Sequence, residues 1–129
     1  MALTKTVTAF SNISGATIAA GGSLVSDDSI DLSKAIDFGI GVKATFNSSA
    51  TQSITVELLA DPRSIDPSFP TSDYFTPVDA GDVDLYPAHI GQAFFPFNRS
   101  AKYVKIRIKN NDTSYSVTGV YAYATVQTP

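Results

Sequence analysis

The residues of this chain best suited to chemistry are three aspartates that crowd around a glycine in the segment VDAGDVDLY. Asp79, Asp82 and Asp84 present carboxylates close together in sequence, and hard cations such as calcium prefer oxygen ligands of this kind. Their spacing does not match the twelve-residue calcium loop that lies between two helices. The three aspartates are therefore candidate metal ligands, beside the alternative of a solvated acidic loop.

Residues for catalysis do not accompany these carboxylates. His89 is the only histidine and the chain has no cysteine, so a catalytic histidine, a thiolate nucleophile or a His/Cys metal site lacks its partners. Glycoside hydrolysis would need two carboxylates flanking the scissile bond. We expect every aspartate except Asp37 in a loop or turn, and Glu57 as a lone outward residue on a strand. The sequence thus predicts no catalytic residue, no cofactor and no enzymatic activity.

Basic residues gather in one stretch near the C-terminal end. Five of the nine fall within eleven positions: Arg99, Lys102, Lys105, Arg107 and Lys109. Basic groups with tyrosines nearby are typical of platforms for single-stranded nucleic acid, but the net charge is −3 and the pI about 4.8, which favours no such partner. Strand alternation places basic groups wherever a strand faces water. We expect a solvated face or a subunit contact, with the acidic segment as counter-charge, and no nucleic-acid partner.

The basic stretch is one side of a predicted β-strand, residues 101–109. Val104, Ile106 and Ile108 fall on the other side of a two-residue period, which is typical of a strand buried on one face. Asn110, Asn111 and Asp112 then predict a turn. We expect residues 115–127 to return as the antiparallel partner.

A second pairing is predicted between residues 35–46 and 53–60. Apolar residues alternate on both arms, with Ile54, Val56 and Leu58 inward, and a polar turn separates them. Gly39 and Gly41 fall on the outward face, where missing side chains permit a bend or close approach by another backbone.

Residues 61–87 differ in character, because they hold five of the seven prolines and six aspartates. We predict a long excursion with a short strand at 73–78. The aromatic residues that follow are suited to closing one end of the core, and long excursions often carry interfaces. The candidate interface residues are Tyr74, Phe75, Phe94, Phe95 and Phe97. Residues 2–10 are expected as a first strand or as an arm within residues 1–12.

Short strands separated by turns, without any helical period, predict an all-β antiparallel sandwich with a single domain over residues 1–129. Both jelly-roll and immunoglobulin-like strand orders remain open. The N-terminus lacks the pattern of a signal peptide, and no apolar run approaches the length of a membrane span, so we expect no membrane partner.

The order GATIAAGGSLVSDDSIDLS, SITVELLADPR, a proline-rich excursion and SAKYVKIRIKNNDTSYSVTGVYAYATV resembles small all-β structural proteins of tailed bacteriophage virions, which decorate capsids or build head and tail parts. The resemblance implies a homo-oligomer, with a trimer as the leading expectation, that contacts other virion proteins such as the major capsid protein. It also implies assembly in the host cytoplasm and residence in the virion.

The segment YVKIRI is also similar to strand endings in discoidin-type and other carbohydrate-binding sandwiches. This resemblance implies the alternative function, a carbohydrate-binding module assisted by calcium at Asp79, Asp82 and Asp84. The chain departs from those modules in having no tryptophan and no cysteine, although its six tyrosines can supply aromatic contacts to a sugar.

Overall fold

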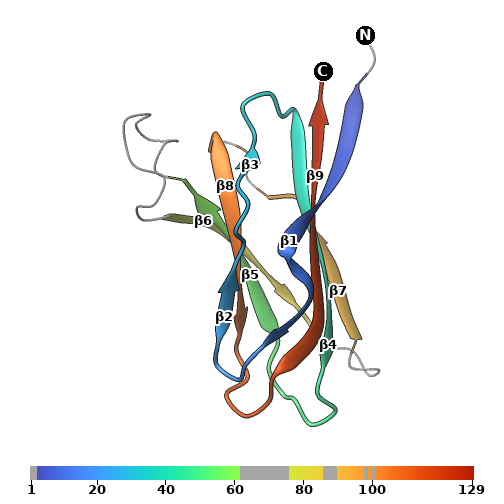
Figure 1. Ribbon diagram of the computed structural model, residues 1–129, viewed down its shortest axis with the longest axis vertical. Helices are drawn as coiled ribbons and strands as arrows, with labels where there is room; N and C mark the ends of the chain where they lie inside the picture. The colour runs from blue at the N-terminus through green and yellow to red at the C-terminus, as the bar shows by residue number, and fades with distance from the viewer. Residues whose placement is uncertain (1–2, 62–75, 86–89, 98, 100) are drawn as a thin grey trace.

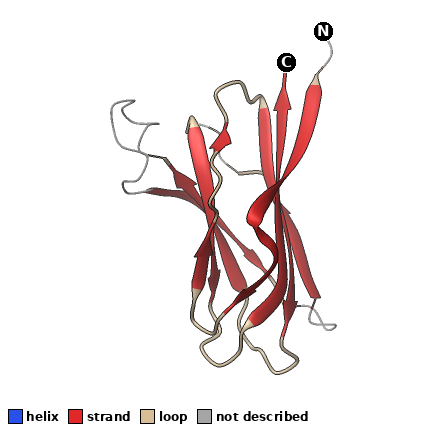
Figure 2. Ribbon diagram, viewed as in Figure 1, coloured by secondary structure: helices blue, strands red, loops and turns tan. Residues whose placement is uncertain are grey.

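The computed structural model describes residues 3–61, 76–85, 90–97, 99 and 101–129, which form two antiparallel sheets packed face to face (Figures 1 and 2). The first sheet has the order β1 (Thr4–Ile18), β9 (Val117–Thr128), β4 (Asp37–Phe46), β7 (Ile90–Phe95). The second has the order β2 (Ser23–Val25), β8 (Tyr103–Asn110), β5 (Ile54–Ala60), β6 (Thr76–Val83), and β3 (Ile30–Asp31) also pairs with β8. The all-β sandwich predicted from the sequence is confirmed. Among the described residues, no helix is long and apolar enough to cross a membrane.

The strands pair in a nested order. With the two-residue β3 set aside, β1 pairs with β9, β2 with β8, β4 with β7 and β5 with β6. Only the innermost pair, β5–β6, joins consecutive strands, and the other connections cross between the sheets. This pairing is that of a jelly roll, which decides between the two strand orders that the sequence leaves open.

Both strand pairings predicted from the sequence are wrong. β4 pairs with β7 and β9, whereas β5 lies in the other sheet and pairs with β6 and β8. In the same way β8 and β9 lie in opposite sheets. The physical reason is that alternation reports only which face of a strand is buried. Two strands that each bury one apolar face fit the pattern equally well whether they are neighbours in one sheet or face each other across the core.

The core lies between the two sheets and is built from the inward residues that the alternation identifies. From the second sheet, Ile54, Val56, Leu58, Val104, Ile106 and Ile108 are all fully buried. From the first sheet, Ile40, Val42 and Ala44 of β4 and Val120, Ala122 and Ala124 of β9 face them. The sequence therefore predicts these inward residues of β4, β5 and β8 correctly although it misassigns the strand partners.

The structure refines the prediction for two segments. Within the predicted excursion 61–87, the short strand expected at 73–78 is β6, which runs from Thr76 to Val83 along the edge of the second sheet. Pro77 is tolerated there because an edge strand has one unpaired side. At the N-terminus, the chain from Thr4 onward is a strand paired with β9, rather than a detached arm.

One corner connects the two sheets at the end of β8. The side-chain amide of Asn110 donates to the carbonyls of Ala19 at 3.3 Å and Tyr115 at 2.9 Å. The carboxylate of Asp112 accepts hydrogen bonds from the backbone amides of Thr51 (2.9 Å), Ser114 (2.8 Å) and Tyr115 (3.1 Å). These amides, with that of Thr51 as the largest cause, hold the pKa of Asp112 below its ordinary value. The β4–β5 and β8–β9 crossings are thus tied together by one side chain.

We predict that Asp112→Ala lowers the melting temperature by several degrees, because three backbone amides lose a charged acceptor. Asp84→Ala is the matched control, since Asp84 is exposed and follows β6. Thermal unfolding followed by circular dichroism tests the pair. Equal melting temperatures for the two variants would contradict this account of the corner.

Candidate binding face

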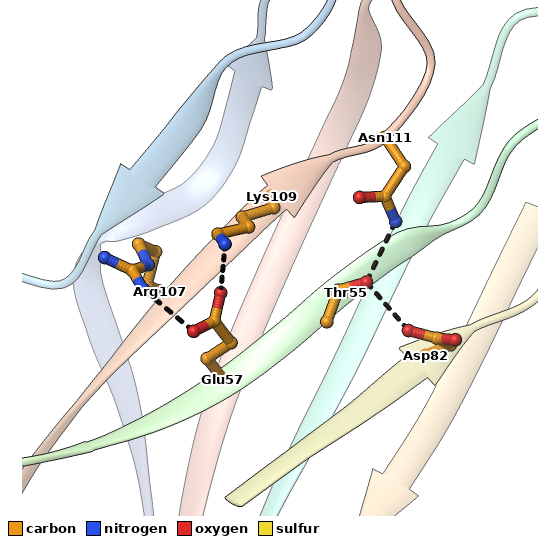
Figure 3. A network of polar contacts seen from close by, with 6 residues as sticks. All are labelled: Thr55, Glu57, Asp82, Arg107, Lys109 and Asn111. Atoms are coloured by element: carbon orange, nitrogen blue, oxygen red, sulfur yellow. Dashed lines mark hydrogen bonds and ion pairs between the residues drawn. The ribbon is translucent and has the colours of Figure 1, made fainter. Parts of the chain in front are cut away.

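The outer face of the second sheet contains an internal ion-pair network around Glu57. Glu57 points away from the core, as its alternation predicts, yet it is only 8% exposed. Its carboxylate accepts a hydrogen bond from Arg107 Nη2 at 2.8 Å and forms an ion pair with Lys109 Nζ at 3.0 Å (Figure 3). Glu57 is therefore not the lone outward residue that the sequence predicts, because two cations of the neighbouring strand cover it.

The same contacts explain the basic stretch. The hydrogen bond from Arg107 holds the pKa of Glu57 below its ordinary value, against the opposing effect of burial, and Lys109 adds to the shift. Elsewhere Arg99 Nη1 donates to the Ala35 carbonyl at 2.9 Å, and Lys102 Nζ lies 5.4 Å from the centroid of the Tyr103 ring. Arg107 and Lys109 find a counter-charge in Glu57 of β5, a residue that the sequence did not identify as their partner.

We predict that Glu57→Gln lowers the free energy of unfolding at pH 7 by about 1–2 kcal/mol, since a partly buried charge-assisted hydrogen bond is lost. A carboxyl whose folded pKa is depressed stabilises the fold above its unfolded pKa and loses that contribution as pH falls through the folded value. The difference between wild type and Glu57→Gln should therefore shrink below about pH 4. Urea titrations at several pH values test this, and a difference independent of pH would contradict it.

The three candidate metal ligands do not gather. Asp79 and Asp82 lie on β6 and not in a loop, and residues three apart on a strand face opposite sides. Asp82 Oδ1 accepts from Thr55 Oγ1 at 2.8 Å, and Thr55 Oγ1 accepts in turn from Asn111 Nδ2 at 2.9 Å (Figure 3). Across the described residues, no group of three or more His, Cys, Asp or Glu side chains is placed to hold a metal ion. Asp82 instead joins β6 to β5.

The outer face of the first sheet is aromatic. Outward positions of β9, β4 and β7 form two adjacent rows, which are Tyr123, Gly41 and Phe94, followed by Tyr121, Lys43 and Gln92. Phe94 is 59% exposed and Tyr123 is 42% exposed. This sheet face leaves large aromatic side chains in water. Exposed aromatic groups collected on one face are typical of binding surfaces.

A groove of about 510 Å³ lies over Gly41, with Tyr123, Phe94, Lys43 and Gln92 around it. The ring of Phe94 leans over Gly39, where it occupies the space that a β-carbon would need. Gly41 remains open, because a β-carbon there would meet only Phe94 Cδ2, at 3.8 Å. A second, smaller hollow of about 130 Å³ lies on the other side of Phe94, beside Lys5, Asp37 and Gln127. We call the region over Gly41 the Gly41 groove.

The candidate interface residues separate into three groups. Phe94 is exposed at the groove. Phe95 and Phe97 stack on each other with centroids 5.1 Å apart, and Phe97 is buried. These two residues therefore pack in the sandwich, as end-closing residues would, and their role at an interface stays a prediction. Tyr74 and Phe75 lie outside the described residues, as does His89.

Sequence reasoning missed Tyr123 as a partner of Phe94. The two residues are far apart in sequence and become neighbours in one row only through the register of β9 and β7 on β4. The available signal was the pair of outward glycines in β4, which predicted a bend or the close approach of another backbone, whereas the group that approaches Gly39 is the ring of Phe94.

No model of a protein family and no curated protein matches the sequence. Among solved structures, the β-porphyranase BpGH86A of glycoside hydrolase family 86 from the human gut bacterium Bacteroides plebeius is 15% identical with a TM-score of 0.54, over 98% of this chain and 20% of that chain. A CBM4 structure is 19% identical with a TM-score of 0.47, over 88% and 68% of the two chains. The SPBc2 prophage-derived protein YomS is 15% identical with a TM-score of 0.46, over 99% and 96%.

The likeness to the porphyranase, of which the chain spans about a fifth, supports the sandwich fold alone. The chain is thus a β-sandwich module, with a prophage-derived protein among its distant structural neighbours.

We predict that Gly41→Ala changes the free energy of unfolding by less than about 0.5 kcal/mol, since the added methyl group enters open space on a strand. Gly91→Ala is the contrasting variant on the paired strand. Its β-carbon would lie 2.7 Å from the Asp84 carbonyl oxygen and 2.7 Å from the Phe46 ring, which should cost about 1–3 kcal/mol through overpacking. Urea unfolding compares the two variants. A large loss of unfolding free energy for Gly41→Ala would mean that the groove is filled.

Proposed function

We propose that this chain is a non-enzymatic structural protein of a tailed-phage virion, a capsid decoration or a head or tail accessory protein. It acts through contacts between its own copies and with other virion proteins, such as the major capsid protein. It assembles in the host cytoplasm and binds neither nucleic acid nor membrane. The sequence resemblance motivates the proposal, and one structural observation carries it: the first half of β1 is an open edge strand.

Residues 3–9 are exposed on both faces of the sheet, with Val7 63% exposed. Thr4 to Ala9 nevertheless keep an unbroken register with β9, and the register shifts begin only after Ala9. Holding residues in strand geometry costs about 1–2 kcal/mol each in backbone entropy. Here hydrogen bonds along one side of the strand offset that cost, and burial contributes little to it. A second strand on the free side would add the missing hydrogen bonds and cover Val7.

The described parts of the edges of the second sheet carry protection against strand pairing. β6 has Pro77, a register shift and the charges of Asp79 and Asp82. β2 and β3 have three and two residues, whereas β7 carries no such device within Ile90–Phe95 but is shorter than β1 and is followed directly by Pro96. Proline, bulges, charges and shortness are the devices by which proteins block edge pairing. Thr4 to Ala9 contain no proline, no bulge and one charge, Lys5.

The partner that suits this edge is a second copy of the same segment. Threonine recurs at every second position from Thr4 to Thr8, and cross-strand threonine pairs are favourable in antiparallel ladders. An antiparallel pair of identical strands has two-fold symmetry. The edge therefore supports a dimer as the first unit of assembly, whereas the sequence resemblance alone suggested a trimer.

We predict that the protein is an oligomer and that Val7→Lys converts it to a monomer, because a lysine at an exposed edge opposes pairing. Val78→Lys is the control, an exposed valine (40%, against 63% for Val7) at the edge of the other sheet. Light scattering after size-exclusion chromatography measures the mass of each form. Mass spectrometry of virions purified from the phage that encodes the chain tests the location. A wild-type monomer at high concentration, absent from those virions, would refute the proposal.

The second candidate function is carbohydrate binding, and the observation that favours it is the aromatic groove over Gly41. Its calcium-assisted form loses support, because Asp79 and Asp82 face opposite sides of β6. A glycan array with and without a chelator tests this candidate, and silence in both conditions would count against it.

A further inference from the structure

We infer that the Gly41 groove is a saccharide site, in which one neutral pyranose ring of an oligosaccharide lies over Gly41 between Phe94 and Tyr123. The inference rests on the carbohydrate-binding candidate above and does not depend on pairing through β1. It places the binding site on the first sheet, where no residue was expected to bind a ligand.

The backbone register sets the width of the site. Gly41 pairs with Tyr123 on one side and with Phe94 on the other. Since neighbouring strands lie about 4.8 Å apart, the two aromatic positions are about 10 Å apart across the glycine. An outward side chain at position 41 would fill this gap. With glycine, the space between the two aromatic residues stays open down to the backbone.

The lining combines apolar rings with unused polar groups. The side chains of Lys43, Gln92 and Tyr123 make no hydrogen bond or ion pair with any other described residue. They offer an ammonium, an amide and a phenol, which together donate and accept. Ligand sites are typically concave and largely apolar, with a few polar groups that fix orientation. A pyranose matches this lining, because its C–H faces are apolar and its rim carries hydroxyls.

The charges around the groove favour holding a sugar over cleaving it. Hydrolysis of a glycosidic bond uses two carboxylates on either side of the bond. Among the described residues, the lining of the Gly41 groove includes no carboxylate, and Asp37 belongs to the hollow beyond Phe94. Lys43 is the single charged group of the lining and serves as a hydrogen-bond donor to hydroxyl or ring oxygens.

The test is a titration of the full chain with cellohexaose, chitohexaose, maltohexaose and neoagarohexaose, each to millimolar concentration. Tyrosine fluorescence and saturation-transfer NMR are the readouts. We expect at least one probe to bind the wild type, and Tyr123→Ala to weaken that binding about ten-fold. Gly41→Val should abolish binding while the melting temperature stays equal or rises, because the valine fills the groove and suits a strand.

The matched control is Tyr115→Ala, which removes a tyrosine that is 38% exposed, outside the groove, and should leave binding unchanged. If no probe binds the wild type, both the carbohydrate-binding candidate and this site are overturned. If binding survives Gly41→Val and Tyr123→Ala, the candidate function stands and this site is wrong. Binding that a chelator abolishes would also overturn the assignment of the site to the Gly41 groove. It would favour Asp79, Asp82 and Asp84 as calcium ligands.

Discussion

The fold depends on the corner where the chain leaves β8 and crosses to the first sheet. Asn110 and Asp112 use side-chain groups to satisfy backbone groups of three separate turns. Backbone hydrogen bonds from Gly21 to Asp112 and from Asn110 to Gly22, 2.8 and 2.9 Å long, add the β1–β2 crossing to the same point. A jelly roll requires its sheet-crossing loops to end in register, because each crossing delivers a strand to a partner far away in sequence. Because one corner binds three of these crossings, it holds their ends in fixed positions relative to one another.

The two outer faces of the sandwich have opposite physical character. On the second sheet, Glu57 of β5 binds Arg107 and Lys109, which both lie on β8, so part of the charge is compensated within the sheet. On the first sheet, outward glycines in β4 lower the surface between β9 and β7, and the aromatic residues on those strands stand above it. The same outward alternation therefore produces a self-contained polar face and an unfilled aromatic one. The difference arises from which residues the register places in one row.

The sequence identifies the strands better than it identifies their neighbours. Ile106 and Val56 were expected to face inward and do so, because a two-residue period is a local property of a strand. The partner of β4 is not local, and a polar turn such as 47–53 can lead either to the adjacent strand or across the core. The candidate site fails to appear in the sequence for the same reason, since Tyr123 and Phe94 meet only through β4. Glu57 shows a related failure, because its burial on an outward face depends on the long side chains of a neighbouring strand.

The nested pairing also has a consequence for how the chain acquires its structure. Only β5 and β6 are paired neighbours in sequence, while Thr4 lies opposite Thr128. Contacts of such wide separation require long loops to close before they contribute stability, and proteins dominated by them fold slowly. The order of closure should run outward from the β5–β6 hairpin, and the β1–β9 pair should close last. Residues 4 and 128 end side by side at one end of the sandwich (Figure 1), so a circular permutant that joined them by a short turn would make the slowest closure of the chain a local one.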